Sequence, residues 1–220
     1  IAFLAGSAMY EINPALPFWV GSGLVILAAL MVFLFVKEPE EFVQTERYNI
    51  ISSLVEVSKD KDKSTFRLLF AIFFWFLGYT AIEAFFTLYA QNHLGLAEAD
   101  GSRLLGHLSL LFVLFAIPSG LIGGNFGRRG TISVGIILLA AAIFGISLTP
   151  VATLTNVLTK LPVLGEILGI SIFLMVAGIA WSLININSLP MVVDMTSIER
   201  IGTFTGLYYL FSTLSAILGP

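Results

Sequence analysis

The chain has 220 residues, of which 57% are hydrophobic and 11% charged. Its net charge of −3 gives no sign of nucleic-acid binding, and the absence of cysteine excludes disulfides and thiolate metal sites. A soluble domain carries about 25% charged residues, so this composition, with a mean hydropathy of +0.96, predicts a membrane protein.

Long apolar runs alternate with short charged segments along the chain. A helical span needs about 20 mostly apolar residues to cross roughly 30 Å of hydrocarbon. Five runs have this length or come close to it: Phe18–Val36, Arg67–Ala90, Leu104–Gly123, Thr131–Thr149 and Gly165–Leu189. The strands of a membrane barrel are only about 10 residues long, so the runs predict an all-α, polytopic transmembrane helical bundle.

Two shorter apolar stretches, Ile1–Tyr10 and Thr203–Pro220, lie at the ends of the chain. We expect them to be pieces of two further spans, which makes about seven spans with the first and last incomplete. On this interpretation the chain is a fragment of a longer protein. Between the spans, Pro150 is expected to end one helix, and Pro162 with Gly165 to open the next.

Lysine and arginine are distributed unevenly over the predicted loops. Nine of the eleven lie in alternate loops, at 37–67, 128–129 and 200, whereas the intervening loops hold only Arg103 and Lys160. Short cytoplasmic loops carry an excess of these residues. The count therefore predicts that loops 37–66, 124–130 and 190–202 are cytoplasmic.

The segment 37–66 differs from the other loops because it is long and highly charged. It contains one short apolar run, Ile50–Val57, for which a cytoplasmic helix and a solvated loop are both open interpretations. Few contacts should cross a linker of this kind. The predicted organisation is 1–36 as the end of an N-terminal bundle with two spans, 37–66 as a cytoplasmic linker, and 67–220 as a C-terminal bundle with five spans.

A glycine-rich motif, Gly-Leu-Ile-Gly-Gly-Asn-Phe-Gly-Arg-Arg, occupies residues 120–129 at a cytoplasmic end. Glycine allows a tight turn, and the paired arginines can bind carboxylates. The alternative interpretation is a short turn whose positive charges only anchor the loop on the cytoplasmic side. The motif resembles the signature loop of the major facilitator superfamily, a Gly, then an Asp four residues later, then Gly-Arg-Arg. Gly120, Gly127, Arg128 and Arg129 match, but Gly124 stands at the Asp position.

Two further segments resemble the same superfamily. The acidic, proline-containing segment Val36–Glu40 is similar to the one after helix six, and 190–200 to the loop before helix eleven. The resemblance implies a partial fold from helix five through most of helix eleven. It implies a secondary transporter of a small polar solute, such as a sugar, with proton coupling and alternating access. Residues 185–194 and 202–209 look most like the sucrose/proton symporter-like branch.

Polar residues within the predicted spans are the candidates for the solute and proton pathway. Tyr79, Glu83 and Thr87 recur every four residues and therefore share one helix face. An ionisable residue at membrane depth is a functional hypothesis by default. Glu83 could bind a polyol or exchange a proton; the alternative is a hydrogen bond that joins two helices.

A second set of pathway candidates lies on the last two predicted spans. Trp181 and Asn185 share one face, with Asn187 offset from it, and Tyr208 begins a polar stripe on the final span. Tryptophan can stack on a sugar and asparagine can bind its hydroxyls. Contacts between helices remain an equal alternative. His107, near the outer end of its span, is interpreted as a residue of the membrane interface.

The cytoplasmic ends supply a candidate gate. We expect Arg128 or Arg129 to pair with Asp194, because both loops lie on the same side, and such pairs would bias one conformation against another. Solvated charges that contribute little are the alternative. The full set of predicted gate residues is Gly120, Gly127, Arg128, Arg129, Asp194 and Arg200.

Several catalytic motifs do not occur in the sequence. There is no P-loop, no His-Glu-x-x-His and no Gly-x-Ser-x-Gly, and only two histidines are present. We therefore expect no enzyme, cofactor or metal site. The expected partners are the bilayer of the plasma membrane, a solute, protons and the remainder of the fold. A membrane enzyme, a receptor or a structural membrane protein remains the alternative class.

Overall fold

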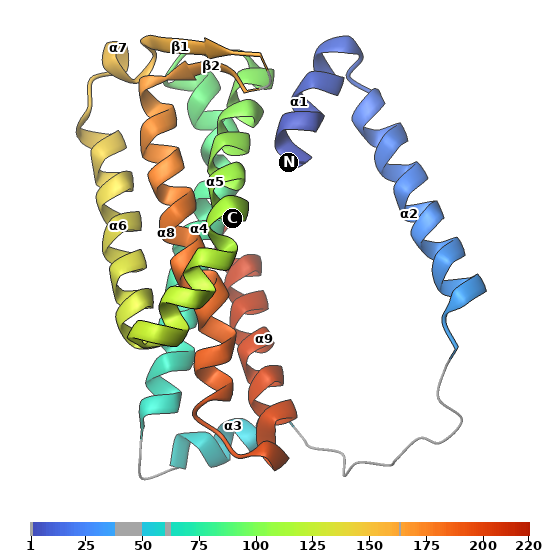
Figure 1. The fold of residues 1–220 in the computed structure, drawn as a ribbon, viewed down its shortest axis with the longest axis vertical. Coiled ribbons are helices and arrows are strands. Elements are labelled where there is room, and N and C mark those ends of the chain that lie inside the picture. The colour runs from blue at the N-terminus through green and yellow to red at the C-terminus, as the bar shows by residue number, and fades with distance from the viewer. Residues whose placement is uncertain (1, 38–49, 60–62, 163) are drawn as a thin grey trace.

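The computed structural model describes residues 2–37, 50–59, 63–162 and 164–220. The described elements, in chain order, are α1 (Ala2–Ile12), α2 (Leu16–Phe35), α3 (Ile50–Lys59), α4 (Ser64–Asn92), α5 (Glu98–Phe126), α6 (Arg128–Leu148), α7 (Val151–Leu154), β1 (Val157–Leu161), β2 (Gly165–Leu168), α8 (Gly169–Val193), the 3₁₀ turn η1 (Ile198–Arg200) and α9 (Ile201–Leu218) (Figure 1).

Six of the described segments are long and apolar enough to cross a membrane. They are α2, α4, α5, α6, α8 and the segment formed by η1 with α9, Ile198–Leu218. The predicted helical transmembrane bundle is thereby confirmed. α1, with 11 residues, is shorter than a span. The last span is 21 residues long and begins before Thr203, so the sequence-based boundary was too late.

α8 lies at the centre of the bundle and packs against α5 and α6, while α4 packs against α9 (Figure 1). In the most apolar 18-residue stretch of α8, 56% of the residues are buried, whereas in that of α2 none are. Small residues allow this close packing. A Cβ at Gly178 of α8 would collide with the backbone carbonyl of Leu108, and one at Gly135 of α6 would crowd the carbonyl of Ala180.

The first two helices occupy the periphery. α1 packs against α5, and α2 descends away from the other helices (Figure 1). No described residue of α2 is buried, and Phe33 is 84% exposed. A helix that is apolar all round but not covered by the chain presents a surface suited to lipid or to another apolar helix.

The predicted linker contains a helix. α3 spans Ile50–Lys59, which agrees with the helical interpretation of Ile50–Val57. Val57 is fully buried in a cluster with residues of α4, α8 and α9, including Leu69 and Phe204. Burial of Val57 therefore packs α3 against the helices that follow it.

A β-hairpin separates α6 from α8 and was not predicted. β1 and β2 pair antiparallel, with Val157 opposite Leu168 and Leu161 opposite Gly165. Gly165 has φ +71°, which only glycine adopts readily. The sequence-based span Gly165–Leu189 therefore began four residues too early. Hydropathy cannot separate an apolar strand from the apolar helix that follows it directly.

The sequence-based span 165–189 ended just before Pro190, whereas Pro150 does follow the end of α6, as expected. α8 continues through Pro190 to Val193, and α5 runs through Pro118 to Phe126. Each proline removes one backbone donor, but neighbouring helices in a membrane protein compensate for such losses. The predicted loop at 190–202 consequently begins only after α8, at Asp194.

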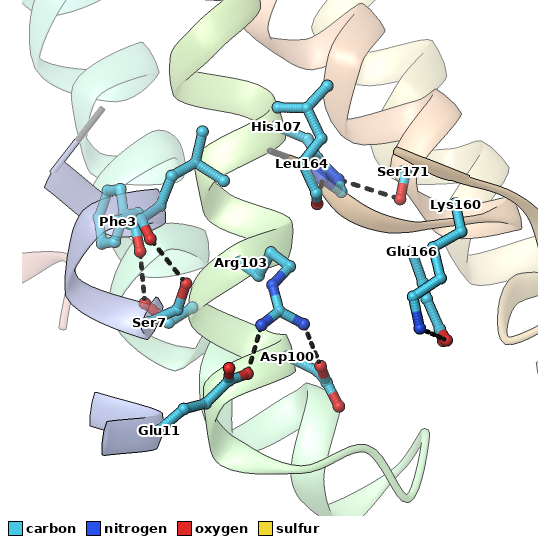
Figure 2. A network of polar contacts seen from close by, with 12 residues as sticks. Phe3, Ser7, Glu11, Asp100, Arg103, His107, Lys160, Leu164, Glu166 and Ser171 are labelled. Carbon is cyan, nitrogen blue, oxygen red and sulfur yellow. Dashed lines mark hydrogen bonds and ion pairs between the residues drawn. The ribbon is translucent and has the colours of Figure 1, made fainter. Parts of the chain in front are cut away.

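His107 joins the hairpin to the bundle. Its side chain is fully buried, with Nδ1 3.1 Å from the Ser171 hydroxyl and Nε2 2.9 Å from the Leu164 carbonyl. Figure 2 shows His107 with these two residues beside it. Both ring nitrogens of His107 are therefore engaged within the protein.

Candidate functional site

The rings of Tyr79 and Trp181 stack against each other near the middle of the bundle. Their centroids are 3.8 Å apart and the ring planes differ by 1°. Each residue lies about halfway along its helix, Tyr79 on α4 and Trp181 on α8. Phe76 packs its ring edge-on against Trp181 at 5.2 Å. The three rings form an aromatic platform about halfway along the two membrane-length helices.

A small cavity of about 30 Å³ adjoins Tyr79. Tyr79, Glu83 and Ser109 are among its lining residues, but almost all of its surface is apolar. The remaining walls are apolar and come from five helices: Phe3, Ile82, Leu105, Leu108, Leu139, Ala142, Ile143, Ile146, Leu174 and Ala177. A volume of this size holds about one water molecule, so a sugar requires the site to open.

Glu83 is half-buried beside this cavity. Within the described parts of the chain it has no ion-pair or hydrogen-bond partner. A carboxyl group that joined two helices would have such a partner. The arrangement leaves Glu83 available for a proton or for a hydroxyl group that enters the cavity.

Two predicted pathway residues lie elsewhere. Thr87 packs against α5, where its methyl carbon would be 3.2 Å from a Cβ added at Gly101. Asn185 is half-exposed and does not line the cavity. Tyr208 contacts the site indirectly, since its ring lies 6.2 Å from that of Phe76 and its hydroxyl is 3.1 Å from the Ser188 hydroxyl. Tyr79, Glu83 and Trp181 therefore form the candidate site.

Asn187, which the sequence placed off the candidate face, forms a buried link between α8 and α5. Its Nδ2 donates to the carbonyl of Ser119 at 3.0 Å and to that of Leu183 at 3.0 Å. The hydroxyls of Ser119 and Ser182 are 2.6 Å apart beside it. The sequence feature that could have indicated this contact is the pair of small residues at 119 and 123 of α5, because they leave room for the Asn187 side chain.

The loop between α5 and α6 is a single residue, Gly127, with φ +92°. This conformation places Arg128 at the start of α6, where its Nε donates to Asp194 Oδ2 at 2.5 Å. Arg128 thus has the partner expected from the sequence. Both residues belong to the segment 67–220, so the pair joins α6 to the end of α8 within one group of helices.

The other predicted gate residues do not join this ion pair. Arg129 lines a separate groove, and Arg200 lies over the ring of Phe204 at 5.1 Å. A Cβ at Gly120 would make an ordinary contact with Ile186 at 3.5 Å. Among the six, Arg128 and Asp194 form an ion pair, and Gly127 sets the turn that positions Arg128.

A cluster at the opposite end of the bundle was missed by the sequence analysis. Arg103 of α5 forms ion pairs with Glu11 of α1 and, at 2.9 Å, with Asp100 of its own helix. Figure 2 shows the guanidinium group between these two carboxylates. The Tyr10 hydroxyl also donates to Glu98 at 3.0 Å. Arg103 and Glu11 are 92 residues apart in the sequence, and Arg103 was considered only as a loop charge, so the cluster was not predicted.

The whole chain, residues 1–220, matches the sequence profile of the Major Facilitator Superfamily. The chain belongs to the major facilitator superfamily. Members of this family are membrane transporters, so the protein is an integral, multi-pass transport protein of a lipid bilayer. No curated protein matches the chain closely enough to serve as a relative.

Membership in the superfamily gives the departure at Gly124 a structural context. The signature loop of this superfamily carries an aspartate at that position, and here a Cβ at Gly124 would have nothing within 4 Å. The carboxylate that Arg128 binds comes instead from Asp194, at the end of α8. In this chain the ion pair therefore joins the start of α6 to the end of α8.

Proposed function

We propose that this major facilitator protein is a secondary transporter of a small polar solute that works by alternating access in the plasma membrane. The observation that carries the proposal is the Tyr79–Trp181 stack beside Glu83, which has no partner among the described residues. Secondary transporters bind their solutes near the bilayer midplane, between bundles that move relative to each other. The two moving parts would be residues 1–36 and 67–220, with 37–66 as a cytoplasmic linker.

The contact between α1 and α5 supports a state closed on the side opposite the cytoplasm. Glu11 and Arg103 pair there across the two proposed parts, and Ser102 donates to the carbonyl of Phe3 at 3.4 Å. Phe3 also lines the cavity next to Tyr79. Separation of α1 from α5 would therefore open this cavity outward and enlarge it enough for a solute.

The proposed solute is a sugar and the proposed coupling ion is a proton. The faces of Tyr and Trp rings suit the apolar faces of sugars, and a carboxyl group binds their hydroxyls. Glu83 could release its proton when the cavity opens to water and regain it when the cavity closes. The Arg128–Asp194 pair would hold the cytoplasmic ends of α6 and α8 in register during this cycle.

The test is uptake of radiolabelled sucrose and glucose by liposomes that contain the full-length protein, with and without an inward proton gradient. Glu83→Gln keeps the shape but cannot change charge. It is expected to abolish gradient-driven accumulation while leaving exchange of preloaded solute. Glu166→Gln, at an exposed position in β2, is the matched control and should behave as wild type.

Each outcome bears on one part of the proposal. Unchanged gradient dependence in Glu83→Gln would remove Glu83 from the coupling mechanism. Uptake of neither sugar, with intact folding, would overturn the sugar assignment. Loss of both accumulation and exchange would assign Glu83 to solute binding rather than to proton transfer alone.

A further inference from the structure

A groove of about 660 Å³ opens between α4, α6 and α8, far larger than the cavity beside Tyr79. It lies at the end that the loop charges assign to the cytoplasm, where α4 and α6 begin and α8 ends. Arg67 from α4 and Arg129 from α6 line it, and no lining residue carries a carboxylate. The groove is therefore an electropositive site between membrane helices.

The residues that the structure describes supply no carboxylate partner to the two arginines of the groove. Among the described residues neither Arg67 nor Arg129 forms an ion pair, whereas the adjacent Arg128 pairs with Asp194. The guanidinium group offers several N–H donors in a plane and binds phosphate oxygens well. Two such groups on different helices can hold one phosphate between them.

Trp75 supplies a second, independent observation. Its indole Nε1 is buried and has no hydrogen-bond partner among the described residues, and Trp75 lines the groove. An indole nitrogen can only donate a hydrogen bond. A buried donor without an acceptor is costly unless a ligand supplies one. The groove therefore lacks an oxygen atom that a bound molecule would provide.

The groove also changes character with depth. Trp75 lies eight residues beyond Arg67 along α4, which is about 12 Å further into the membrane. Apart from Ser64 and Ser133, the other walls are apolar, formed by Leu68, Ala71, Ile132, Ile136, Met191 and Met195. A free phosphate ion makes no favourable contact with apolar walls. A lipid has a charged headgroup joined to apolar chains and can contact both the arginines and the walls.

We propose that this groove binds an anionic phospholipid of the cytoplasmic leaflet. Arg67 and Arg129 hold its phosphate, the Trp75 indole donates to an ester oxygen, and the apolar walls of α4, α6 and α8 receive the acyl chains. Basic pockets between helices on the cytoplasmic side have the chemistry that anionic headgroups require. The site is separate from Tyr79, Glu83 and Trp181, so it does not depend on the proposed solute or coupling ion.

The test is native mass spectrometry of the purified full chain, titrated with phosphatidylglycerol or with phosphatidylcholine. Wild type is expected to retain phosphatidylglycerol preferentially. Arg67→Gln with Arg129→Gln should weaken that binding by about thirtyfold, as expected for loss of two basic contacts. Trp75→Phe should weaken it severalfold. Lys37→Gln removes a cytoplasmic charge outside the groove and should change nothing.

Conservative variants and a competition separate the remaining outcomes. Arg67→Lys with Arg129→Lys keeps both charges and should retain the lipid preference, and either single glutamine variant should lose about fivefold if the double variant does not fold. Equal lipid binding by all variants, or an equal loss in Lys37→Gln, would overturn the proposal. Complete displacement of phosphatidylglycerol by inorganic phosphate would also overturn it, in favour of a free phosphate site.

Discussion

Arg103 of α5 and Glu11 of α1 form an ion pair although they are 92 residues apart in the sequence. The arginine side chain is 20% exposed and the glutamate side chain 50%. The pair joins the two parts of the chain that we propose to move against each other. It lies at the end opposite Arg128 and Asp194, so its effect on conformation can be tested separately.

Removing this ion pair should favour the outward-open state. Exposed pairs contribute up to about 1 kcal/mol, which corresponds to roughly a fivefold change in a conformational equilibrium. The chain has no cysteine, so Ser109→Cys can report on the cavity without further changes. Arg103→Gln is expected to increase labelling of Cys at 109 by a membrane-impermeant maleimide added outside.

The controls for this prediction use charges of the same kind. Lys160→Gln breaks an exposed pair with Glu166 inside the hairpin and should leave labelling unchanged. Exchange of the charges, Glu11→Arg with Arg103→Glu, should restore part of the wild-type protection. Identical labelling in wild type and Arg103→Gln would show that this pair does not hold the outer side closed.

Asp194→Asn should slow transport without unfolding the protein. The Arg128–Asp194 pair has side-chain exposures of 29% and 57%, so its loss should cost no more than about 1 kcal/mol. Arg128→Gln should have the same effect, and the double variant should be no worse than either single one. The measurement is the initial uptake rate together with the thermal midpoint in detergent.

Arg129→Gln is the matched control for this cycle, because Arg129 adjoins Arg128 but does not contact Asp194. Its effect should add to that of Asp194→Asn, since the two side chains share no contact. Additivity between Arg128→Gln and Asp194→Asn instead would mean that the ion pair has no energetic coupling.

Gly123→Ala should destabilise the α5–α8 interface. A Cβ at Gly123 would overlap the side-chain amide of Asn187, which is fully buried. Overpacking of this kind costs about 1–3 kcal/mol, and the displaced Asn187 would lose its bond to Ser119. Thermal unfolding in detergent is expected to occur at lower temperature than in wild type.

The neighbouring glycine provides the control for this substitution. Gly124→Ala places a methyl group in open space, with nothing within 4 Å, and adds a residue that favours helix. Its melting temperature should equal that of wild type or exceed it. If both variants melted alike, the close approach of α5 to Asn187 would not be tight in solution.

Trp181→Leu should weaken solute binding more than Trp181→Phe. Stacked aromatic pairs contribute about 0.5–1.5 kcal/mol beyond their buried area, and leucine removes both the stack on Tyr79 and the platform for a sugar. The expected loss of affinity is about tenfold for leucine, measured by equilibrium binding. Trp75→Phe, outside the stack, should bind the solute as wild type does.

The helical class of this protein follows from composition and run length. Runs such as Thr131–Thr149 are too long and too apolar for any other structure in a bilayer. In the structure α6 begins three residues before that run and ends one residue before its end. The contact of Arg128 with Asp194 was also predictable, because the charge count placed both loops on one side. Hydropathy and loop charge are enough to predict such features, because the exclusion of apolar groups from water and of charges from lipid decides them.

The hairpin and the proline-containing helix ends were not predictable in this way. Val157–Leu161 becomes a strand because Gly165–Leu168 pairs with it, and hydropathy does not report pairing. Pro190 remains inside α8 because tertiary packing offsets the missing hydrogen bond. Strand pairing and the compensation of a proline within a helix each involve a few kcal/mol. Both depend on neighbours that are far away in the sequence.

The candidate site shows the same division. From the sequence alone, Tyr79 and Glu83 share one face of a helix, and their polarity at membrane depth marks them as candidates. Periodicity also placed Thr87 on that face, but only packing shows that Thr87 meets Gly101 whereas Tyr79 meets Trp181. The partner of a residue on another helix depends on helix rotation and crossing, which no repeat along one helix encodes.

The sequence by itself determined that this protein is a helical membrane protein, which loops share a side, and which polar residues lie within the bilayer. Hydrophobic exclusion and loop charge act locally and can be counted along the chain. The tertiary structure alone decided that Arg103 reaches Glu11, that Asn187 rather than Asn185 joins α8 to α5, and that Arg67 and Arg129 face one groove. Such contacts arise between helices, because close packing selects one rotation of each helix against its neighbours.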